Sequence, residues 1–258
     1  MSKPIDSKTV TIFNHLKRKP NLETKEIISL SSSEVYDVLN RNSNETVNYW
    51  FKLQQAWCNN AYNTFKDYDS YLVLIYLVNE IFKKLSDRFQ YLTYQEFYEK
   101  KELLIDKINL IEISKDLNIP KETIRRKVNF LQSKNIIFRK GKSIFFNSHF
   151  LNSTQRPANS KQIMSVFLEK SGQILAKEDW FGRSFNRVEI EKFIDKYFTI
   201  CWQHWFRLQI PFLVRHRTFY GDLETWNVWG SIGISQFSDF NKQVQSRVIE
   251  DPRSYADL

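Results

Sequence analysis

Residues 109–146 decide the fold of this chain, and they read NLIEISKDLNIPKETIRRKVNFLQSKNIIFRKGKSIFF. Asn109 stands directly before an apolar pattern of helical spacing, which is where a helix N-cap belongs. The helix that it starts is short and ends near Leu117. Pro120 opens a second helix, which we expect to continue to about Ser133. The two helices are therefore separated by a tight turn.

A β-hairpin is predicted directly after the second helix. Residues 136–138 and 144–146 are β-prone runs, and a basic, glycine-containing turn joins them. The order of capped short helix, tight turn, second helix and hairpin is that of a winged helix-turn-helix, which we place at residues 104–147. The apolar positions expected to pack such a unit are Ile111, Ile113 and Leu117 on the first helix, Ile119 in the turn, and Ile124, Val128 and Leu131 on the second helix.

The second helix carries polar and basic side chains opposite its apolar stripe. At about 100° per residue, Arg126 points almost directly away from that stripe, with Asn129 and Ser133 beside it. Arginine binds guanine and asparagine binds adenine through paired hydrogen bonds, while threonine and lysine reach phosphates. The candidate DNA-binding residues on the helix and the hairpin turn are Lys121, Thr123, Arg125, Arg126, Asn129, Ser133, Arg139, Lys140 and Lys142.

Positive charge is concentrated in the same segment. The whole chain has a formal net charge of +9. Residues 121–142 hold eight basic side chains against one acidic side chain, so they carry +7 of that total. A basic patch on a groove-sized helix and its hairpin is the expected footprint of a phosphate binder. Two other interpretations stay open, namely a solvated basic helix and a winged helix that contacts protein.

Residues 113–128, ISKDLNIPKETIRRKV, together with Leu131, Ile136 and Ile137, resemble bacterial winged-helix regulators of the MarR, GntR and IclR type. Asn135 stands where those proteins usually have glycine, which is a mild departure because asparagine tolerates the left-handed conformation. The resemblance implies a transcriptional regulator whose second helix reads operator DNA. It is confined to residues 109–146 and says nothing about the flanking regions.

The flanking regions have the pattern of helices. Besides the winged helix, the sequence predicts a mobile basic arm at 1–33, helical regions at 34–103 and 161–245, a linker at 148–160 and a tail at 246–258. The C-terminal region is expected to hold a helix from Ser160 to about Leu168. A longer helix from Asn186 to Arg215 follows it, kinked or stopped at Pro211.

Two segments of the flanking regions are similar to each other. Residues 50–54 read WFKLQ and residues 205–209 read WFRLQ. The similarity predicts that the C-terminal region repeats residues 45–90 and pairs with them in one bundle. The alternative is a chance match between two aromatic-rich helices. Residues 71–89 are apolar nearly all round, which predicts a central helix.

Composition favours helices over a β-sandwich, because the 258 residues include only six Gly and six Pro. The predicted fold is mainly α, with a winged helix-turn-helix and its two-stranded β-wing embedded in an aromatic-rich helical bundle. Six tryptophans are expected mostly in the core of that bundle, with an effector pocket as the alternative: Trp50, Trp57, Trp202, Trp205, Trp226 and Trp229.

Several classes of protein do not fit the sequence. Its two cysteines, Cys58 and Cys201, are far apart in the sequence and predict neither a disulfide framework nor a zinc knuckle. A protein without disulfides is expected in a reducing cytoplasm. The longest apolar run, residues 71–78, is too short for a membrane span of about 20 residues. His204 and His216 could join Cys201 at a metal, but a structural role is the simpler interpretation. Nucleotide-binding and nucleophile-elbow motifs are lacking, so neither an enzyme nor a cofactor is expected.

The predicted function is sequence-specific binding of double-stranded DNA by a cytoplasmic transcriptional regulator. A homodimer is expected because one short helix reads too few base pairs for genomic specificity. The identity of any small-molecule effector is left open. One alternative is a replication initiator or DNA-architectural factor that uses the same unit. An alternative from another class is an adaptor whose winged helix binds protein.

Overall fold

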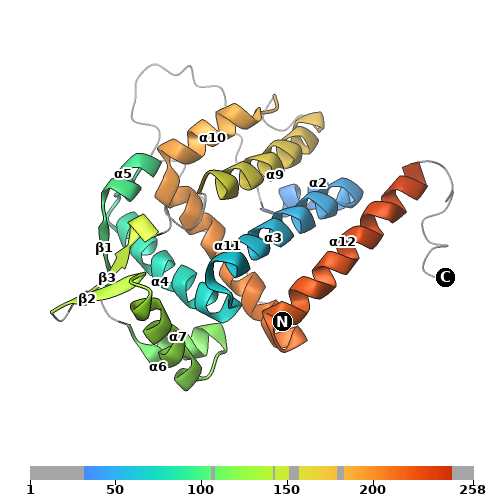
Figure 1. The fold of residues 1–258 in the computed structure, drawn as a ribbon. Helices are drawn as coiled ribbons and strands as arrows, with labels where there is room; N and C mark the ends of the chain where they lie inside the picture. The colour runs from blue at the N-terminus through green and yellow to red at the C-terminus, as the bar shows by residue number, and fades with distance from the viewer. Residues whose placement is uncertain (1–31, 106–107, 142, 151–156, 179–182, 246–258) are drawn as a thin grey trace, which may run out of the picture.

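The computed structural model describes residues 32–105, 108–141, 143–150, 157–178 and 183–245. Figure 1 shows a mainly helical chain with one small sheet. The elements in chain order are α2 (Ser32–Arg41), α3 (Ser43–Phe65), α4 (Tyr68–Asp87), α5 (Tyr94–Glu99), β1 (Glu102–Ile105), α6 (Leu110–Leu117), α7 (Lys121–Ser133), β2 (Ile137–Lys140), β3 (Ser143–Asn147), α9 (Pro157–Lys177), α10 (Arg187–Lys196), α11 (Phe198–Tyr220) and α12 (Leu223–Gln245).

Helix α4 is the centre of the fold. Asp67 caps its first turn, because the carboxylate accepts a hydrogen bond from the Ser70 backbone N–H at 3.1 Å. Buried side chains then follow one another around the whole helix, Tyr71 to Ile75 among them. Helices α3, α7 and α11 and strand β1 all pack against α4. The central helix predicted from the apolar pattern is therefore present.

The sheet has three strands, whereas the sequence analysis predicted two. Its order is β1-β3-β2, with both pairs antiparallel, and Phe146 of β3 stands between Leu103 and Ile137. Strand β1 begins within the range predicted as helical, residues 34–103, and ends within the range predicted as the winged helix. Its residues alternate, since Leu103 and Ile105 are buried and Leu104 is exposed. Four residues are too few to show that period in the sequence, and pairing with β3 makes them a strand.

The prediction of one long helix from Asn186 to Arg215 is wrong, because two helices stand in its place. Asn186 does cap a helix, with the reciprocal Glu189 bonds of a capping box, but α10 ends at Lys196. Tyr197 leaves the helical region, with φ −117° and ψ 39°, and α11 begins beside it. Pro211 lies inside α11 and does not end it, because the helix continues to Tyr220. The helix therefore tolerates the absence of the one backbone hydrogen bond that proline cannot donate.

Two predicted boundaries also change. Residues 32 and 33 were assigned to the basic arm and belong to α2, whereas the rest of the arm lies outside the described residues. Helix α9 begins at Pro157, inside the predicted linker, and continues to Lys177 rather than to Leu168. The predicted tail, residues 246–258, lies outside the described residues.

Aromatic rings fill the contact between α3 and α11. Trp57 packs against Trp202 and Trp205, with ring centroids 5.3 and 5.0 Å apart, and all three are buried. Trp226 is buried as well, but Trp229 is 58% exposed on α12, which contradicts its predicted core position. In Figure 1, α6, α7 and the sheet lie at the opposite side of the molecule from α9 and α10, and α12 extends away from both.

Candidate nucleic-acid interface

The turn between α6 and α7 is fixed by hydrogen bonds. Asn118 ends α6 in the left-handed conformation, with φ 51° and ψ 42°. The Ile119 N–H donates to the Ser114 carbonyl at 3.1 Å, and the Ser114 hydroxyl donates to the Ile119 carbonyl at 2.7 Å. Pro120 then precedes the first residue of α7. These contacts set the angle at which α7 leaves α6.

Helix α7 is anchored by a buried stripe and turns its other face to solvent. Ile124, Val128 and Leu131 are 0%, 6% and 0% exposed, as their spacing predicted. The side chains on the opposite face are exposed because 100° per residue carries them away from that stripe. Of the sequence-predicted site residues on α7, Thr123 is half-buried, whereas the following are exposed: Lys121, Arg125, Arg126, Asn129 and Ser133. On α6, Ile113 and Leu117 are buried as predicted, but the prediction that Ile111 packs inward is wrong, because it is 65% exposed in the first turn of the helix.

The two arginines of α7 differ in their partners. Arg125 forms an ion pair with Glu122, with Nη2 2.6 Å from Oε1, and this hydrogen bond lowers the pKa of the Glu122 carboxyl. Arg126 donates to the Thr123 hydroxyl at 3.2 Å and forms no ion pair with any described residue. Arg126 therefore keeps most of its donors for a ligand, whereas Arg125 would first have to leave Glu122.

The β2–β3 hairpin projects from the edge of the molecule next to α6 and α7 (Figure 1). Arg139 and Lys140 are exposed there, and Gly141 adopts a positive φ of 60° that the turn requires. Lys142 lies outside the described residues. Lys140 pairs with Glu102 of β1, with Nζ 2.5 Å from Oε2. Its charge is therefore partly neutralised within the sheet.

Lys127 belongs to the basic segment but faces the bundle instead of solvent. Its ammonium group lies 2.6 Å from Asp67 Oδ2, and both side chains are less than one-third exposed. Burial raises the pKa of Asp67, but hydrogen bonds from Lys127 and Ser70 outweigh it and leave the pKa below its ordinary value. The pair joins α7 to the start of α4, so Lys127 contributes to position rather than to the exposed patch.

Helix α6 is joined to α4 and α11 by polar contacts. The Tyr76 hydroxyl donates to Asp116 at 2.6 Å. Arg217 of α11 donates to the Asn118 carbonyl at 3.1 Å and to Asp69 at 2.9 Å. The Asn118 amide donates to the Thr218 hydroxyl at 3.1 Å. These bonds tie the turn before α7 to the bundle.

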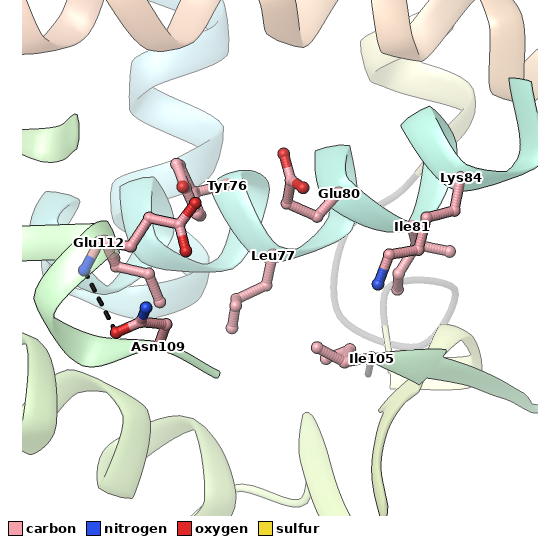
Figure 2. A pocket seen from close by; sticks show the side chains of 9 residues that line it. Tyr76, Leu77, Glu80, Ile81, Lys84, Ile105, Asn109 and Glu112 are labelled. Atoms are coloured by element: carbon pink, nitrogen blue, oxygen red, sulfur yellow. Dashed lines mark hydrogen bonds between the residues drawn. The ribbon is translucent and has the colours of Figure 1, made fainter. Parts of the chain in front are cut away.

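Figure 2 shows a hollow beside this junction, lined by α4, β1 and α6. Asn109 caps α6 there, and Glu112 donates its backbone N–H to the Asn109 side chain. Glu80 and Lys84 line its other side. The hollow has a volume of about 60 Å³, which is far below the ~300 Å³ of a small-molecule site. It is therefore a packing gap between elements.

Sequence reasoning missed two acidic partners of the basic segment. Glu102 binds Lys140 and Asp67 binds Lys127, across 38 and 60 residues of sequence. Local patterns cannot reveal partners at such separations. Lys134, at the end of α7, was counted in the charge but not in the site, and it is exposed with its Nζ 5.9 Å from the Phe130 ring centroid.

Among the described residues, no three His, Cys, Asp or Glu side chains gather as metal ligands. The His216 ring nitrogen instead lies 2.8 Å from the Phe212 carbonyl of the same helix. Within that same part of the chain, every helix is too short or too polar to span a bilayer.

The chain was compared with protein-family models, with curated proteins and with solved structures. None of the three comparisons finds a match to it.

Proposed function

We propose that residues 102–147 form a winged helix that binds double-stranded DNA with sequence preference, and that the chain is a transcriptional regulator. The order β1, α6, α7, β2, β3 is the element order of such a unit. The observation that carries the proposal is the exposed face of α7, where Arg126 and Asn129 stand opposite a fully buried stripe.

In this proposal α7 lies in the major groove. Arg126 donates to a guanine and Asn129 pairs with an adenine, while Arg125, Thr123 and Ser133 contact neighbouring bases or the backbone. Lys121 and the backbone N–H groups at the start of α7 face a phosphate. Arg139 and Lys140, with Lys142, bind the backbone or the minor groove beside it.

The specificity of a regulator requires a second copy of the unit. One recognition helix reads few base pairs, and two-fold dimers double the site. Helix α12 offers a surface for that contact, because Val228, Trp229 and Ile232 are 60%, 58% and 46% exposed on one stretch of it. An exposed apolar face of this kind is typical of an interface. We therefore propose a homodimer formed through α12.

The proposal is tested by selecting bound duplexes from a random pool at physiological salt. We expect one recurring sequence, arranged as two half-sites about one helical turn apart. Arg126→Ala should lose about 1–3 kcal/mol of preference for the selected sequence over random duplex, since it removes a base contact. Arg88→Ala, which changes an exposed arginine at the end of α4, is the matched control and should keep that preference.

Two results would contradict the proposal. If the folded chain shifts no duplex at physiological salt, residues 102–147 are not a DNA-binding unit. If Arg126→Ala binds selected and random duplexes with wild-type affinities, α7 does not read bases.

A further inference from the structure

A second cavity, more than ten times larger than the hollow of Figure 2, lies between α9, α10 and α11. Its volume is about 740 Å³, within the ~300–1,000 Å³ range of small-molecule sites. Its walls are mainly apolar and come from all three helices, with Met164, Phe167, Leu168, Phe193, Trp202 and Leu208 among them.

Two residues that line this cavity carry polar atoms without a partner. The Ser171 hydroxyl and the Trp205 indole N–H are buried and form no hydrogen bond within the described part of the chain. The residues themselves are 9% and 6% exposed. Buried donors are nearly always satisfied in folded proteins. Rotation about the Cα–Cβ bond of Ser171 can turn its hydroxyl toward the cavity, where it can donate to an acceptor of a bound molecule, whereas the Trp205 N–H is covered by its neighbours.

The remaining polar groups of the cavity set the charge that it accepts. Burial raises the pKa of the Cys201 thiol to about 12, so the thiol is neutral at pH 7. Burial, with the nearby Arg207 charge, lowers the pKa of His204 and favours its neutral form. Arg183 and Glu189 form an ion pair at 2.8 Å and are the charged residues that line the cavity. The walls therefore suit an apolar molecule with an acceptor group.

We propose that this cavity binds a small, mainly apolar molecule that carries a carbonyl-type or anionic oxygen acceptor, and that α11 transmits its binding to α7. Five residues in the first half of α11 line the cavity, namely Cys201, Trp202, His204, Trp205 and Leu208. Arg217 and Thr218, near the end of the same helix, hold Asn118 at the turn before α7. The transmission to DNA rests on the proposed function, whereas the binding of the molecule does not.

The binding is tested with two fluorescent probes in the absence of DNA. One is 1-anilinonaphthalene-8-sulfonate, and the other is N-phenyl-1-naphthylamine, which has the same rings without the sulfonate acceptor. Gly172→Leu should abolish saturable binding of both probes, because Gly172 lines the cavity and a Cβ there meets no atom within 4 Å. Gly233→Leu on α12 has equally open surroundings outside the cavity and should bind both probes like the wild type.

The role of the hydroxyl donor is tested with Ser171→Ala. We expect about tenfold weaker binding of the sulfonate probe and unchanged binding of the uncharged probe, because only the first offers an acceptor. If Gly172→Leu binds both probes normally, the cavity is not the site. If Gly172→Leu instead converts a dimer into a monomer, the cavity holds a second copy of the chain. Either result overturns the proposal.

The link through α11 has its own measurement. Saturating sulfonate probe should change the affinity of the wild type for its selected duplex at least threefold and leave that of Gly172→Leu unchanged. Equal affinity with and without probe, in a protein that binds both probe and duplex, overturns the transmission. A protein that binds the probe but no duplex contradicts the proposed function alone.

Discussion

Gln54 of α3 and Gln209 of α11 bind each other through two reciprocal hydrogen bonds, in which each amide nitrogen donates to the other's oxygen at 3.0 and 2.9 Å. Both side chains are buried, at 1% and 0% exposure. They are the last residues of the similar segments 50–54 and 205–209, whose first residues, Trp50 and Trp205, also pack together. Equivalent positions of the two segments therefore meet. A repeat that pairs with itself predicts this contact, and the repeat itself stays a prediction.

The glutamine pair leads to a test of stability. Gln54→Leu should lower the free energy of unfolding by about 1–3 kcal/mol, because it leaves the Gln209 amide buried without a partner. The double variant with Gln209→Leu should recover most of that loss, since no buried amide then remains unsatisfied. Urea unfolding of the wild type, both single variants and the double variant measures the coupling. Strictly additive losses would show that the two amides act independently.

The ion pair between Glu102 and Lys140 leads to a prediction on DNA affinity. Glu102→Gln should free the Lys140 ammonium group for phosphate, strengthen binding to all duplexes about two- to fivefold and steepen the salt dependence by about one counterion. Lys140→Ala should weaken binding to selected and random duplexes alike and make the salt dependence shallower. Titrations of both duplexes over a range of salt concentrations check both variants.

A matched control for this pair is Glu99→Gln, which removes a nearby exposed carboxylate of α5 that pairs with Gln95 instead of a cation. It should leave the salt dependence unchanged. If Glu102→Gln and Glu99→Gln strengthen binding equally, net charge alone explains the effect, and Lys140 makes no contact with the backbone.

The salt bridge between Asp67 and Lys127 predicts a dependence of stability on pH. The pKa of Asp67 is lower in the folded chain than its ordinary value of 3.8. Its contribution is therefore fully present above that value and is lost as pH falls through the folded pKa. Asp67→Asn keeps a side chain that caps helices but removes the charge. It should lower the free energy of unfolding by about 1.5 kcal/mol at pH 7, and the difference from wild type should shrink below pH 4.

Thermal unfolding between pH 2.5 and 7 measures this difference. Asp87→Asn, at an exposed carboxylate that forms no ion pair with the described residues, should follow the wild-type profile. A gap between Asp67→Asn and wild type that stays constant across the whole range would mean that the carboxylate charge does not hold α7 to α4.

Local patterns in the sequence predicted what local interactions produce. The Asn109 cap and the buried stripe of Ile124, Val128 and Leu131 were readable because a helix repeats its contacts every three or four residues. The exposure of Arg126 follows from the same periodicity. The central position of α4 was readable for a similar reason, since apolar residues all around a helix require cover on every side.

Structural features that depend on residues far away in the sequence could not be predicted from local sequence patterns. Strand β1 exists because Leu103 and Ile105 pair with β3, about forty residues later in the sequence. The position of Lys127 is set by Asp67 and not by its own neighbours. The break at Tyr197 brings the Thr199 backbone N–H to the Leu92 carbonyl at 3.2 Å, another contact across the chain. In each case tertiary packing decided between conformations that the local sequence allowed.

The exposed face of α12 leads to the last prediction, which concerns oligomeric state. Trp229→Glu places a charge in the apolar surface that we propose joins two copies, so it should convert a dimer into a monomer without unfolding the chain. Sedimentation measures the mass, and circular dichroism reports whether the helices remain. Tyr36→Glu is the control, because Tyr36 is another exposed aromatic residue, 65% exposed, on α2 rather than α12. The monomeric variant should also lose more affinity for a duplex with two half-sites than for a duplex with a single half-site. Only the duplex with two half-sites can bind both subunits of a dimer at once. If Trp229→Glu keeps the wild-type mass, or if Tyr36→Glu changes it equally, α12 is not the dimer interface.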